Sequence, residues 1–436
     1  MSPALARSLI WVAALLPALA VVVLIREGDL ASPSAALNFL GRLTGIAGLA
    51  LMLASAILSC RVPGFDRPFG GLTKLWKTHH YLATAAFLLL LAHPLLLAFA
   101  AAPVSMEAAV ATLVPSGANW GLWTGWAALV LMMLFLGPGY RFFGEPDYQR
   151  WKYLHRLAAP AVILALAHTF LLARTLPWFW EMVLWVGLAA LAVVSISYRF
   201  VWSRTFGRLP YRIERVERPA NNVVELELAA AGQPLRYEAG QFVYLTPRDP
   251  NLANGRGEEH PYTLSSAPGE PNLRIAIKAL GDASRAIQDV AVGSEALVEG
   301  PYGGFFPQTS SPEAPELWIA GGIGVTPFLG RARHLASLGE AVDIVMIFCV
   351  QDEARAVWLD EFRELASRLP GFVFNMHYFY QQGPLDGTFL SEHCPNVAAR
   401  TVYICGPGPL LTIAQQVALQ AGVPRTRIVT EEFDLL

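Results

Sequence analysis

The stretch Trp76–His93 reads WKTHHYLATAAFLLLLAH, and a second stretch, Trp151–His168, resembles it and reads WKYLHRLAAPAVILALAH. Each contains an apolar run long enough to cross a bilayer as a helix. Each also carries one histidine near its start and another near its end. Ionisable groups inside a membrane are costly and usually functional, so these two stretches decide how the rest of the chain is interpreted.

The spacing of these histidines predicts a pair of haems. His79 and His93 are 14 residues apart, and His155 and His168 are 13 apart. At the helical rise per residue, the two imidazoles of each helix lie about 20 Å from one another. That separation suits two haems stacked across the membrane, each held by one histidine from each helix. The alternative is histidines satisfied by helix–helix hydrogen bonds, but two pairs at nearly the same spacing favour haem.

One ligand position is ambiguous. Matching W-K-x-x-H in the two stretches aligns His80 with His155, whereas helix phase favours His79, because 14 residues fall only about 40° short of four full turns. We take His79 as the ligand. His155 and His168 are about 140° out of phase, so we expect a tilt or a local bulge in that helix.

Composition divides the chain between membrane and water. Its 436 residues are 54% hydrophobic and 15% charged, with a mean hydropathy of +0.41. That is too apolar for an ordinary soluble protein of this size, so part of the chain is expected to lie in membrane lipid. A net charge of −2 gives no reason to expect nucleic acid as a partner. The four cysteines lack paired metal-ligand spacing and are interpreted as free thiols in a reducing compartment.

Six apolar segments are predicted to cross the membrane. They run roughly over residues 8–25, 36–59, 79–101, 121–136, 154–172 and 178–201. Basic residues concentrate between the second and third segments and between the fourth and fifth. The positive-inside rule then places both termini in the cytoplasm of a multi-pass protein of the cell's inner (plasma) membrane. His79 and His155 would lie near the inner face, and His93 and His168 near the outer.

After Arg204 the pattern becomes that of a soluble β domain. Short alternating runs from Tyr211 onward, separated by Pro, Asn and Gly, predict an antiparallel barrel. It carries HPYTLSSAP at 260–268, in which a Tyr and a Thr at strand spacing can stack on a flavin ring and donate to its phosphate or ribityl chain. Taken alone, Tyr262 fits better as a half-buried strand aromatic.

The barrel also carries a candidate pyrophosphate loop. The segment KALGDAS at 278–284 contains Lys278, Gly281 and Ser284 and is followed by Arg285. It offers backbone amides, a hydroxyl and positive charge to a phosphate group.

From Leu317 onward the pattern is α/β. LWIAGGIGVTP is an apolar strand, a glycine turn and a helix that begins near Pro327. Gly321, Gly322 and Gly324 let a dinucleotide pyrophosphate approach the backbone at the helix N-terminus. Two later strands, at 344–350 and in TVYICGPGP at 401–409, also end in glycines or polar groups. Ligands of open parallel sheets bind at that edge.

These motifs together resemble a known family. HPYTLSSAP, GGIGVTP and YICGPGP, following two bis-histidine membrane helices, resemble the ferric reductase and NADPH oxidase superfamily, and the soluble half looks like a ferredoxin–NADP reductase module. The family pattern, with thirteen residues between the first histidines and twelve between the second, supports the pairs chosen above. The expected fold is a six-helix transmembrane di-haem bundle (1–205), an antiparallel β-barrel FAD domain (206–309) and an α/β NAD(P)-binding domain (310–436).

The resemblance also implies site residues. FAD would be bound by His260, Pro261, Tyr262 and Thr263, and NADH or NADPH by Gly322, Gly324, Thr326, Pro327, Cys405, Gly406 and Pro407. Phe433, in the closing EEFDLL, resembles the C-terminal aromatic residue that covers the flavin face in the family. Three residues follow it here, whereas some members end on the aromatic.

The chemistry indicates a transmembrane oxidoreductase. NAD(P)H delivers two electrons as a hydride and haem iron takes one at a time, so FAD is required as the converter. Electrons would then pass through an inner and an outer haem b to a small-molecule acceptor at the outer face. Two axial histidines leave no open position at the iron, so the acceptor is reduced at the haem edge.

Ferric iron or ferric chelates are the preferred acceptor. The alternatives are an NAD(P)H oxidase that makes superoxide from oxygen and, in another class, an electron conduit for a partner protein that the sequence does not itself require. Arg42, at the predicted outer end of the second helix, would stabilise a developing superoxide or an anionic chelate. It would equally snorkel to headgroups or neutralise a haem propionate. Leu97, one turn beyond His93, favours a general chelate reductase over oxygen-specific chemistry.

The preference for NADH or NADPH is predicted from the residues that follow the second strand of the α/β domain. Gln351 and Asp352 stand where a cation for the 2′-phosphate of NADPH is expected, and the nearest positive charge is Arg355. This favours NADH, or poor discrimination between the two.

Overall fold

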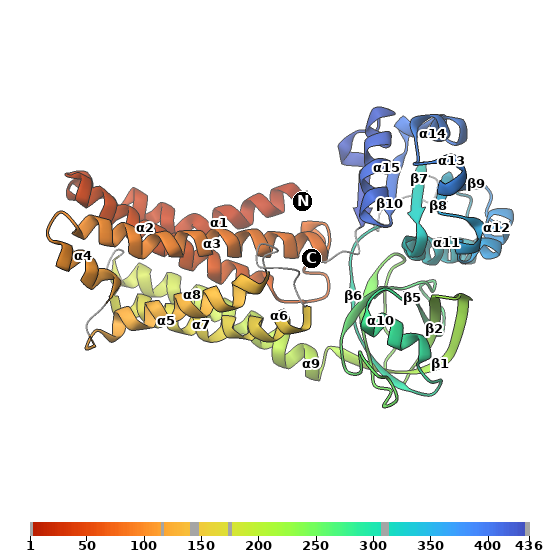
Figure 1. The fold of residues 1–436 in the computed structure, drawn as a ribbon. Helices are drawn as coiled ribbons and strands as arrows, with labels where there is room; N and C mark the ends of the chain where they lie inside the picture. The colour runs from red at the N-terminus through yellow and green to blue at the C-terminus, as the bar shows by residue number, and fades with distance from the viewer. Residues whose placement is uncertain (1–2, 115–116, 140–147, 173–176, 307–313, 432–436) are drawn as a thin grey trace. The chain divides into compact units, whose positions relative to one another are not determined.

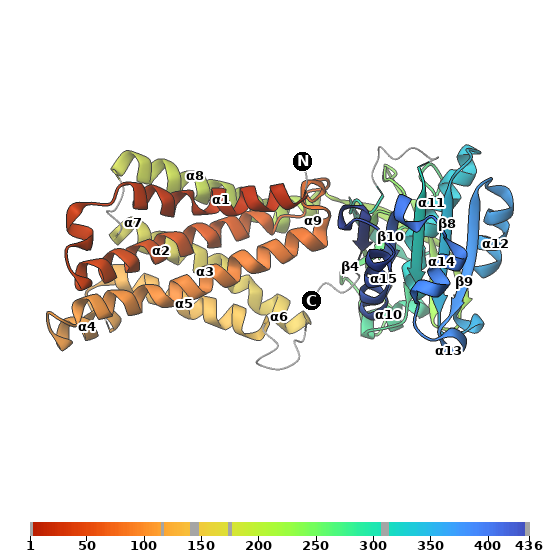
Figure 2. The same ribbon diagram turned by 90° about the horizontal axis from the view of Figure 1, so that it is seen from above.

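The computed structural model describes residues 3–114, 117–139, 148–172, 177–306 and 314–431. The chain divides into two compact units, which are described in turn (Figures 1 and 2). The first, Met1–Arg61 with Lys74–Val201, is helical. The second, Val62–Thr73 with Trp202–Leu436, contains a β domain and an α/β domain.

The first unit consists of long apolar helices that run side by side (Figures 1 and 2). Within the described residues, six stretches are long and apolar enough to cross a membrane: Pro3–Val23, Pro33–Leu58, Leu72–Ala101, Trp120–Gly139, Trp151–Leu172 and Trp178–Thr205. All six predicted spans are therefore confirmed as helices of membrane-spanning length and composition.

Local sequence signals set several of the helix ends. Ser32 and Ser105 each accept a hydrogen bond from the backbone N–H three residues on, and Pro33 takes the first helical position of its helix. The helices are α1 (Pro3–Val23), α2 (Pro33–Leu58), α3 (Leu72–Ala101), α4 (Met106–Leu113), α5 (Trp120–Leu136), α6 (Tyr148–Leu154), α7 (Ala158–Leu172), α8 (Trp178–Ser197) and α9 (Ser203–Thr205).

The expected irregularity beside His155 is present. Residues His155–Leu157 form a 3-10 turn between α6 and α7. Such a turn advances about 120° per residue rather than about 100°, so it brings the ring of His155 closer in phase to that of His168. The sequence led us to expect a tilt or a local bulge here, and the irregularity that is present is a 3-10 turn.

The β domain is a curled antiparallel sheet, a half-barrel. Its strand order is β4-β3-β6-β1-β2-β5, and a single bridge between Leu264 and Ile275 joins the two ends of that order. The strands are β1 (Arg208–Ala220), β2 (Val223–Ala230), β3 (Phe242–Pro247), β4 (His260–Thr263), β5 (Leu273–Lys278) and β6 (Glu295–Tyr302).

Alternation along β2 shows how the sheet sorts its side chains. Val224, Leu226 and Leu228 point into the half-barrel and are fully buried there. Val223 and Glu225 point to the opposite face, where Val223 joins the core of the α/β domain. The outer face of this strand is therefore a packing surface.

The α/β domain is a five-stranded parallel sheet in the order β11-β10-β7-β8-β9. One face carries α11 and α12 and the other α14 and α15, each over its own apolar core. Its elements are β7 (Glu316–Gly321), α11 (Thr326–Leu338), β8 (Ile344–Val350), α12 (Leu359–Arg368), β9 (Phe372–Tyr378), α13 (Phe379–Gln382), α14 (Gly387–His393), β10 (Thr401–Cys405), α15 (Gly408–Gln420) and β11 (Ile428–Glu431).

The strand order reverses between β7 and β10. From β7 the chain adds β8 and β9 on one side, then crosses back to place β10 and β11 on the other. In sheets of this kind the ligand crevice lies at the carboxyl ends of the strands on either side of such a reversal. Those ends are Gly321 and Cys405.

Candidate functional site

The four predicted ligand histidines face one another in two pairs. The ring centroids of His79 and His155 are 6.3 Å apart, and those of His93 and His168 are 6.2 Å apart. His80 is exposed, and its ring lies beside that of Tyr81 instead. Of the two candidates on α3, His79 is therefore the one brought to a partner histidine.

The separation within each pair fits a haem iron. Two metal–nitrogen bonds of about 2 Å, with about 1 Å from each ligating nitrogen to its ring centre, give a centroid separation of about 6 Å. A porphyrin supplies the other four ligands, so a pair of histidines is sufficient. No cluster of three or more His, Cys, Asp or Glu side chains in metal-binding geometry occurs in the described part of the chain.

Hydrogen bonds orient three of the four imidazole rings so that Nε2 can bind a metal. The Nδ1 atoms of His93, His168 and His79 lie 2.7, 2.8 and 2.8 Å from the carbonyl oxygens of Gly41, Gly121 and Ser55 respectively. An Nδ1–H that donates to a carbonyl fixes the tautomer whose Nε2 carries the lone pair for a metal. The arrangement of these rings thus fits bis-histidine ligation.

A short repeat explains how α2 and α5 admit the rings of His93 and His168. The pattern Gly-x-x-Thr-Gly occurs at 41–45 on α2 and at 121–125 on α5. A Cβ on Gly45 would lie 2.7 Å from Nδ1 of His93, and one on Gly125 would lie 2.6 Å from Nδ1 of His168. Only glycine leaves space for either ring.

The threonine of each repeat also makes the same contact in both helices, because its hydroxyl donates to the glycine carbonyl that accepts from the histidine. The distance is 2.9 Å from Thr44 to Gly41 and 2.8 Å from Thr124 to Gly121. Neither repeat was among the motifs predicted from the sequence. A comparison of the second predicted span with the fourth would have found them.

Arg42 does not present a free charge. Its guanidinium forms an ion pair with Asp29, which follows α1, and lies over the ring of Phe39. The backbone N–H of Arg26 and the guanidinium of Arg42 hold the pKa of Asp29 below its usual range. The charge predicted to attract an acceptor is therefore already balanced by a carboxylate.

The flavin motif lies on β4 and the segment that follows it. Tyr262 stands opposite Val243 of β3, and burial raises the pKa of its hydroxyl. Thr263 is buried, and Ser265 and Ser266 beyond it are fully so. His260 at the start of the strand lies 3.1 Å from the carboxylate of Glu258. Pro261 has no N–H to donate, and pairs with Tyr244.

The expected pyrophosphate loop is internally bonded. Lys278 ends β5, and the Ser284 hydroxyl accepts hydrogen bonds from the backbone N–H groups of Leu280 and Gly281, at 2.9 and 2.8 Å. The guanidinium of Arg285 donates to the Leu280 carbonyl. The amides predicted to meet a phosphate are thus satisfied by Ser284. Phe433 lies outside the described residues.

The nucleotide motifs meet at the reversal of strand order. A Cβ on Gly324 would lie 2.5 Å from the carbonyl oxygen of Cys405, and one on Gly406 would lie 3.1 Å from Cα of Gly321. Gly322 has a left-handed φ of +53° and open space beside it, so its backbone is accessible. Thr326 and Pro327 begin α11 directly after this turn, and Pro407 precedes α15.

Cys405 contributes backbone here, because its side chain is fully buried and burial raises its thiol pKa well above the usual range. The turn of β7 and the end of β10 therefore form one surface where a phosphate can approach main-chain N–H groups.

Buried charges link the flavin motif to α11. Arg333 donates to both carboxylate oxygens of Glu361 at 2.6 and 2.8 Å, to Glu225 at 3.2 Å and to the carbonyl of Ser265 at 2.8 Å. Gly330, on the same helix, would place a Cβ 3.0 Å from the carbonyl of Leu264. These contacts fix α11 against the segment that follows β4.

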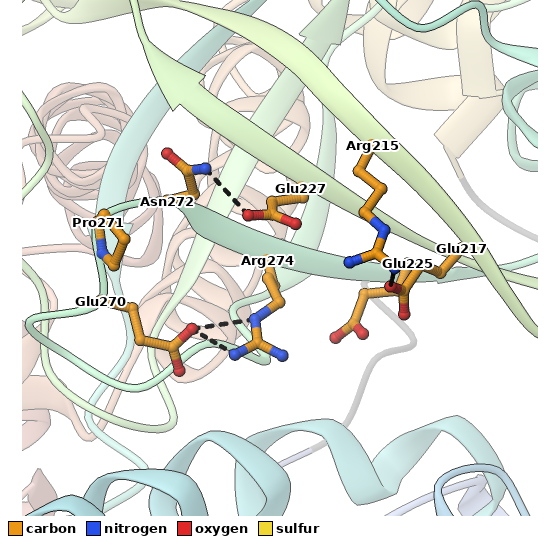
Figure 3. A pocket seen from close by; sticks show the side chains of 8 residues that line it. All are labelled: Arg215, Glu217, Glu225, Glu227, Glu270, Pro271, Asn272 and Arg274. Carbon is orange, nitrogen blue, oxygen red and sulfur yellow. Dashed lines mark hydrogen bonds and ion pairs between the residues drawn. The ribbon is translucent and has the colours of Figure 1, made fainter.

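A charged pocket of about 370 Å³ lies on the outer face of β1, β2 and β5 (Figure 3). Its groups pair among themselves, with Asn272 donating to Glu227 at 2.9 Å and Arg274 to Glu270 at 3.0 Å. The lining residues are Arg215, Glu217, Glu225, Glu227, Glu270, Pro271, Asn272 and Arg274. This set does not include the predicted flavin or nucleotide residues, and its two arginines, Arg215 and Arg274, are paired with Glu217 and Glu270.

Three family models match consecutive parts of the chain. A ferric reductase-like transmembrane component matches residues 44–166, an FAD-binding domain matches 209–305, and an oxidoreductase NAD-binding domain matches 318–416. The fold and these matches define a multi-pass membrane protein that carries an FAD-binding domain and an oxidoreductase-type NAD-binding domain. The chain belongs to the ferric reductase and NADPH oxidase superfamily, with a ferredoxin–NADP reductase-like module, as its motifs indicated.

Individual relatives share part of this architecture. The ferredoxin reductase component of 3-ketosteroid-9-alpha-monooxygenase from Mycolicibacterium smegmatis is 32% identical over 47% of this chain and 58% of its own length. The reductase component of propane 2-monooxygenase from Rhodococcus jostii is 26% identical over 51% of this chain and 62% of its own. This chain therefore spans roughly 60% of the length of these curated relatives.

Among solved structures, a flavohemoglobin from Malassezia yamatoensis with bound FAD and heme matches 92% of this chain and 97% of its own at 18% identity, with a TM-score of 0.50. At that identity the likeness concerns the fold alone.

Proposed function

We propose that this protein carries electrons from cytosolic NAD(P)H through FAD and two b-type haems to ferric iron or ferric chelates at the outer face of the plasma membrane. The observation that carries this proposal is the pair of facing histidines at each end of the bundle, with ring centroids 6.3 and 6.2 Å apart. When bound, the flavin converts the two electrons of a hydride into the single electrons that haem iron accepts.

Different residues would bind the haems, the flavin and the nucleotide. His79 with His155, and His93 with His168, would hold the two irons, and the carbonyls of Gly41, Gly121 and Ser55 orient three of those rings. Tyr262 and Thr263 would bind the flavin. The main chain at Gly322 and Gly406 would accommodate the nucleotide pyrophosphate. We retain the boundaries near residues 205 and 309 as the limits of the three domains, and cytoplasmic termini as the orientation.

A ferric acceptor is preferred to oxygen because the side chains one turn beyond the outer histidines are apolar. Leu97 packs against Gly41, where an added Cβ would lie 2.7 Å from the leucine side chain. Leu172 packs against Gly121, where an added Cβ would lie 2.9 Å from it. Each leucine stands one turn beyond a histidine. Oxygen-specific reduction would be helped by a polar group at either position, whereas electron transfer from a haem edge to a chelate needs none.

The pairing of Arg42 with Asp29 supports the alternative role of this arginine, charge balance at the helix end, over a role in attracting an anion. NADH is the preferred donor, because Arg355 is held by Asp352 and lies over the ring of Tyr380.

The test is haem content followed by acceptor specificity. Purified protein is expected to contain two low-spin haems b per chain, and His93→Ala and His155→Ala are each expected to lower that content. NADH oxidation with ferric citrate, in the absence of oxygen, is then expected to exceed superoxide production in air. A faster superoxide-forming rate would favour the oxidase, and turnover only after addition of a membrane or periplasmic extract would favour the electron conduit. Full haem content in both histidine variants would refute the ligand assignment.

A further inference from the structure

The four histidines are not held alike. His93, His168 and His79 each have Nδ1 within 2.8 Å of a carbonyl oxygen on the neighbouring helix. The Nδ1 atom of His155 is buried and makes no hydrogen bond within the described structure. One member of the His79–His155 pair therefore lacks the interaction that orients the other three rings.

The difference follows from the spacing of the histidines. On α2 the two carbonyl acceptors, Gly41 and Ser55, are as far apart in sequence as the two histidines of α3 that they serve. When the repeats at 41–45 and 121–125 are aligned, Phe135 of α5 corresponds to Ser55. His155 and His168 are one residue closer together, and His155 starts a 3-10 turn, so its ring does not reach a carbonyl of α5.

Aromatic rings contact His155 where a carbonyl is missing. Phe135 is 5% exposed, and its ring is nearly perpendicular to the imidazole, at 86° and a centroid distance of 5.2 Å. The indole of Trp151 lies on the imidazole at 4.9 Å and 37°. Gly139 makes room for that indole, because a Cβ there would lie 2.9 Å from its Nε1. His155 is thus confined by shape rather than by a hydrogen bond.

We propose that Phe135 and Trp151 are the positioning residues of His155, and that this contact leaves His155 the weakest electron donor of the four axial ligands. The inference rests on the proposed binding of two haems. A hydrogen bond from Nδ1–H makes the imidazole more basic, which stabilises ferric over ferrous iron and lowers the midpoint potential. Because no such bond to His155 is formed by the described residues, a haem between His79 and His155 would have one strongly and one weakly donating ligand.

The first test supplies the missing acceptor. Phe135→Asn places an amide oxygen beside the Nδ1–H of His155, and Phe135→Leu is the matched control that removes the ring without adding an acceptor. Potentiometric titration of the purified full-length holoprotein should resolve two midpoint potentials. In Phe135→Asn one of them should fall while the other stays in place, and in Phe135→Leu neither should fall. A fall of equal size in both variants, or no change in Phe135→Asn, would overturn the proposal.

A second pair of variants keeps the proposal testable if Phe135→Asn does not assemble. Trp151→Leu removes the indole from His155, and Trp76→Leu changes the tryptophan at the matching position of the other W-K stretch. The pyridine haemochrome assay should show Trp151→Leu with about half the haem of the wild type, and Trp76→Leu with all of it. Equal haem content in the two variants would contradict a positioning role for Trp151. Wild-type protein without haem would instead refute the proposed function.

Discussion

Glycines admit a close neighbour in both halves of this chain, but the neighbours differ. In the helical unit a Cβ on Gly45 or Gly125 would meet an imidazole ring, at 2.7 and 2.6 Å. In the α/β domain a Cβ on Gly324 would meet the main chain of Cys405, at 2.5 Å. A side chain can turn away from an added methyl group, whereas a strand within a sheet cannot. Glycine therefore makes room for a proposed haem ligand in the first region and for the strands of the sheet in the second.

The largest expected effect tests the second half of that contrast. Gly324→Ala forces β10 away from β7, and overpacking of this kind costs about 3 kcal/mol or more where nothing can yield. We expect thermal unfolding of the soluble unit to shift down accordingly, and NADH-dependent flavin reduction to be lost. Gly387→Ala is the control, because a Cβ on Gly387 meets nothing within 4 Å. Similar melting temperatures for the two variants would show that the turn tolerates a side chain.

A slightly smaller effect is expected where α11 meets the flavin segment. Arg333→Met leaves the carboxylates of Glu225 and Glu361 without their cation. Breaking a buried ion pair is costly, but the Glu361 side chain is 32% exposed, so we expect a loss of about 3 kcal/mol at most. Because the helix that begins at the glycine turn would lose its contact with Ser265, the rate of hydride transfer should fall more than the KM for NADH rises.

The control for that variant is Arg363→Met, on α12, whose side chain is 54% exposed and pairs with the exposed acids Glu353 and Asp360. Exposed ion pairs contribute about 1 kcal/mol or less. Thermal unfolding and stopped-flow flavin reduction would be measured for both variants. If Arg333→Met behaved like Arg363→Met, the buried network would have no part in fixing α11.

The glycines of the helical unit should respond differently. Gly125→Ala pushes the ring of His168 aside, so we expect one of the two haems to be lost while the helices still form. Helix propensity alone favours alanine over glycine by about 1 kcal/mol, so weakened helices cannot explain a loss of haem. Gly187→Ala on α8, where a Cβ meets nothing within 4 Å, should keep the full haem content. If the Gly125→Ala variant still bound two haems per chain, the proposed role of the glycine repeat would be wrong.

The sequence predicted those features of the fold that depend on local hydrophobic periodicity or on short motifs. The apolar runs predicted the six spans, and the imperfect phase of His155 and His168 predicted an irregularity in their helix, which is present as a 3-10 turn at residue 155. The alternation after Tyr211 and the glycine turn after Leu317 predicted the half-barrel and the parallel sheet. In each case the signal lies within a few residues of the feature that it predicts.

Interactions between distant segments were not predictable in this way. Arg333 pairs with Glu225, more than a hundred residues earlier in the chain, and Arg42 pairs with Asp29 across a turn whose geometry the sequence does not specify. The hydrogen bonds of Gly41, Gly121 and Ser55 require the register of one helix against another. That register is set by packing, and a single sequence carries no direct signal for it.

The smallest expected effect concerns the choice between NADH and NADPH. We expect this choice to depend on side chains rather than on the glycines compared above. In the proposed mode of binding, the main chain at Gly322 would meet the pyrophosphate of NADH and NADPH alike, so discrimination would fall to the residues after β8. There Arg355 is paired with Asp352, and the two side chains are 54% and 36% exposed. An exposed pair of this kind changes affinity by about fivefold or less.

Asp352→Asn releases Arg355 and removes a carboxylate that repels a 2′-phosphate, so the KM for NADPH should fall by up to about fivefold while the KM for NADH changes little. Arg355→Ala should leave both values within about twofold, because the arginine is already engaged. Steady-state kinetics with each nucleotide and a saturating ferric chelate would measure both. A large rise in the KM for NADPH in Arg355→Ala would mean that this arginine already binds the 2′-phosphate. The preference for NADH would then be wrong, whereas the backbone role assigned to Gly322 would stand.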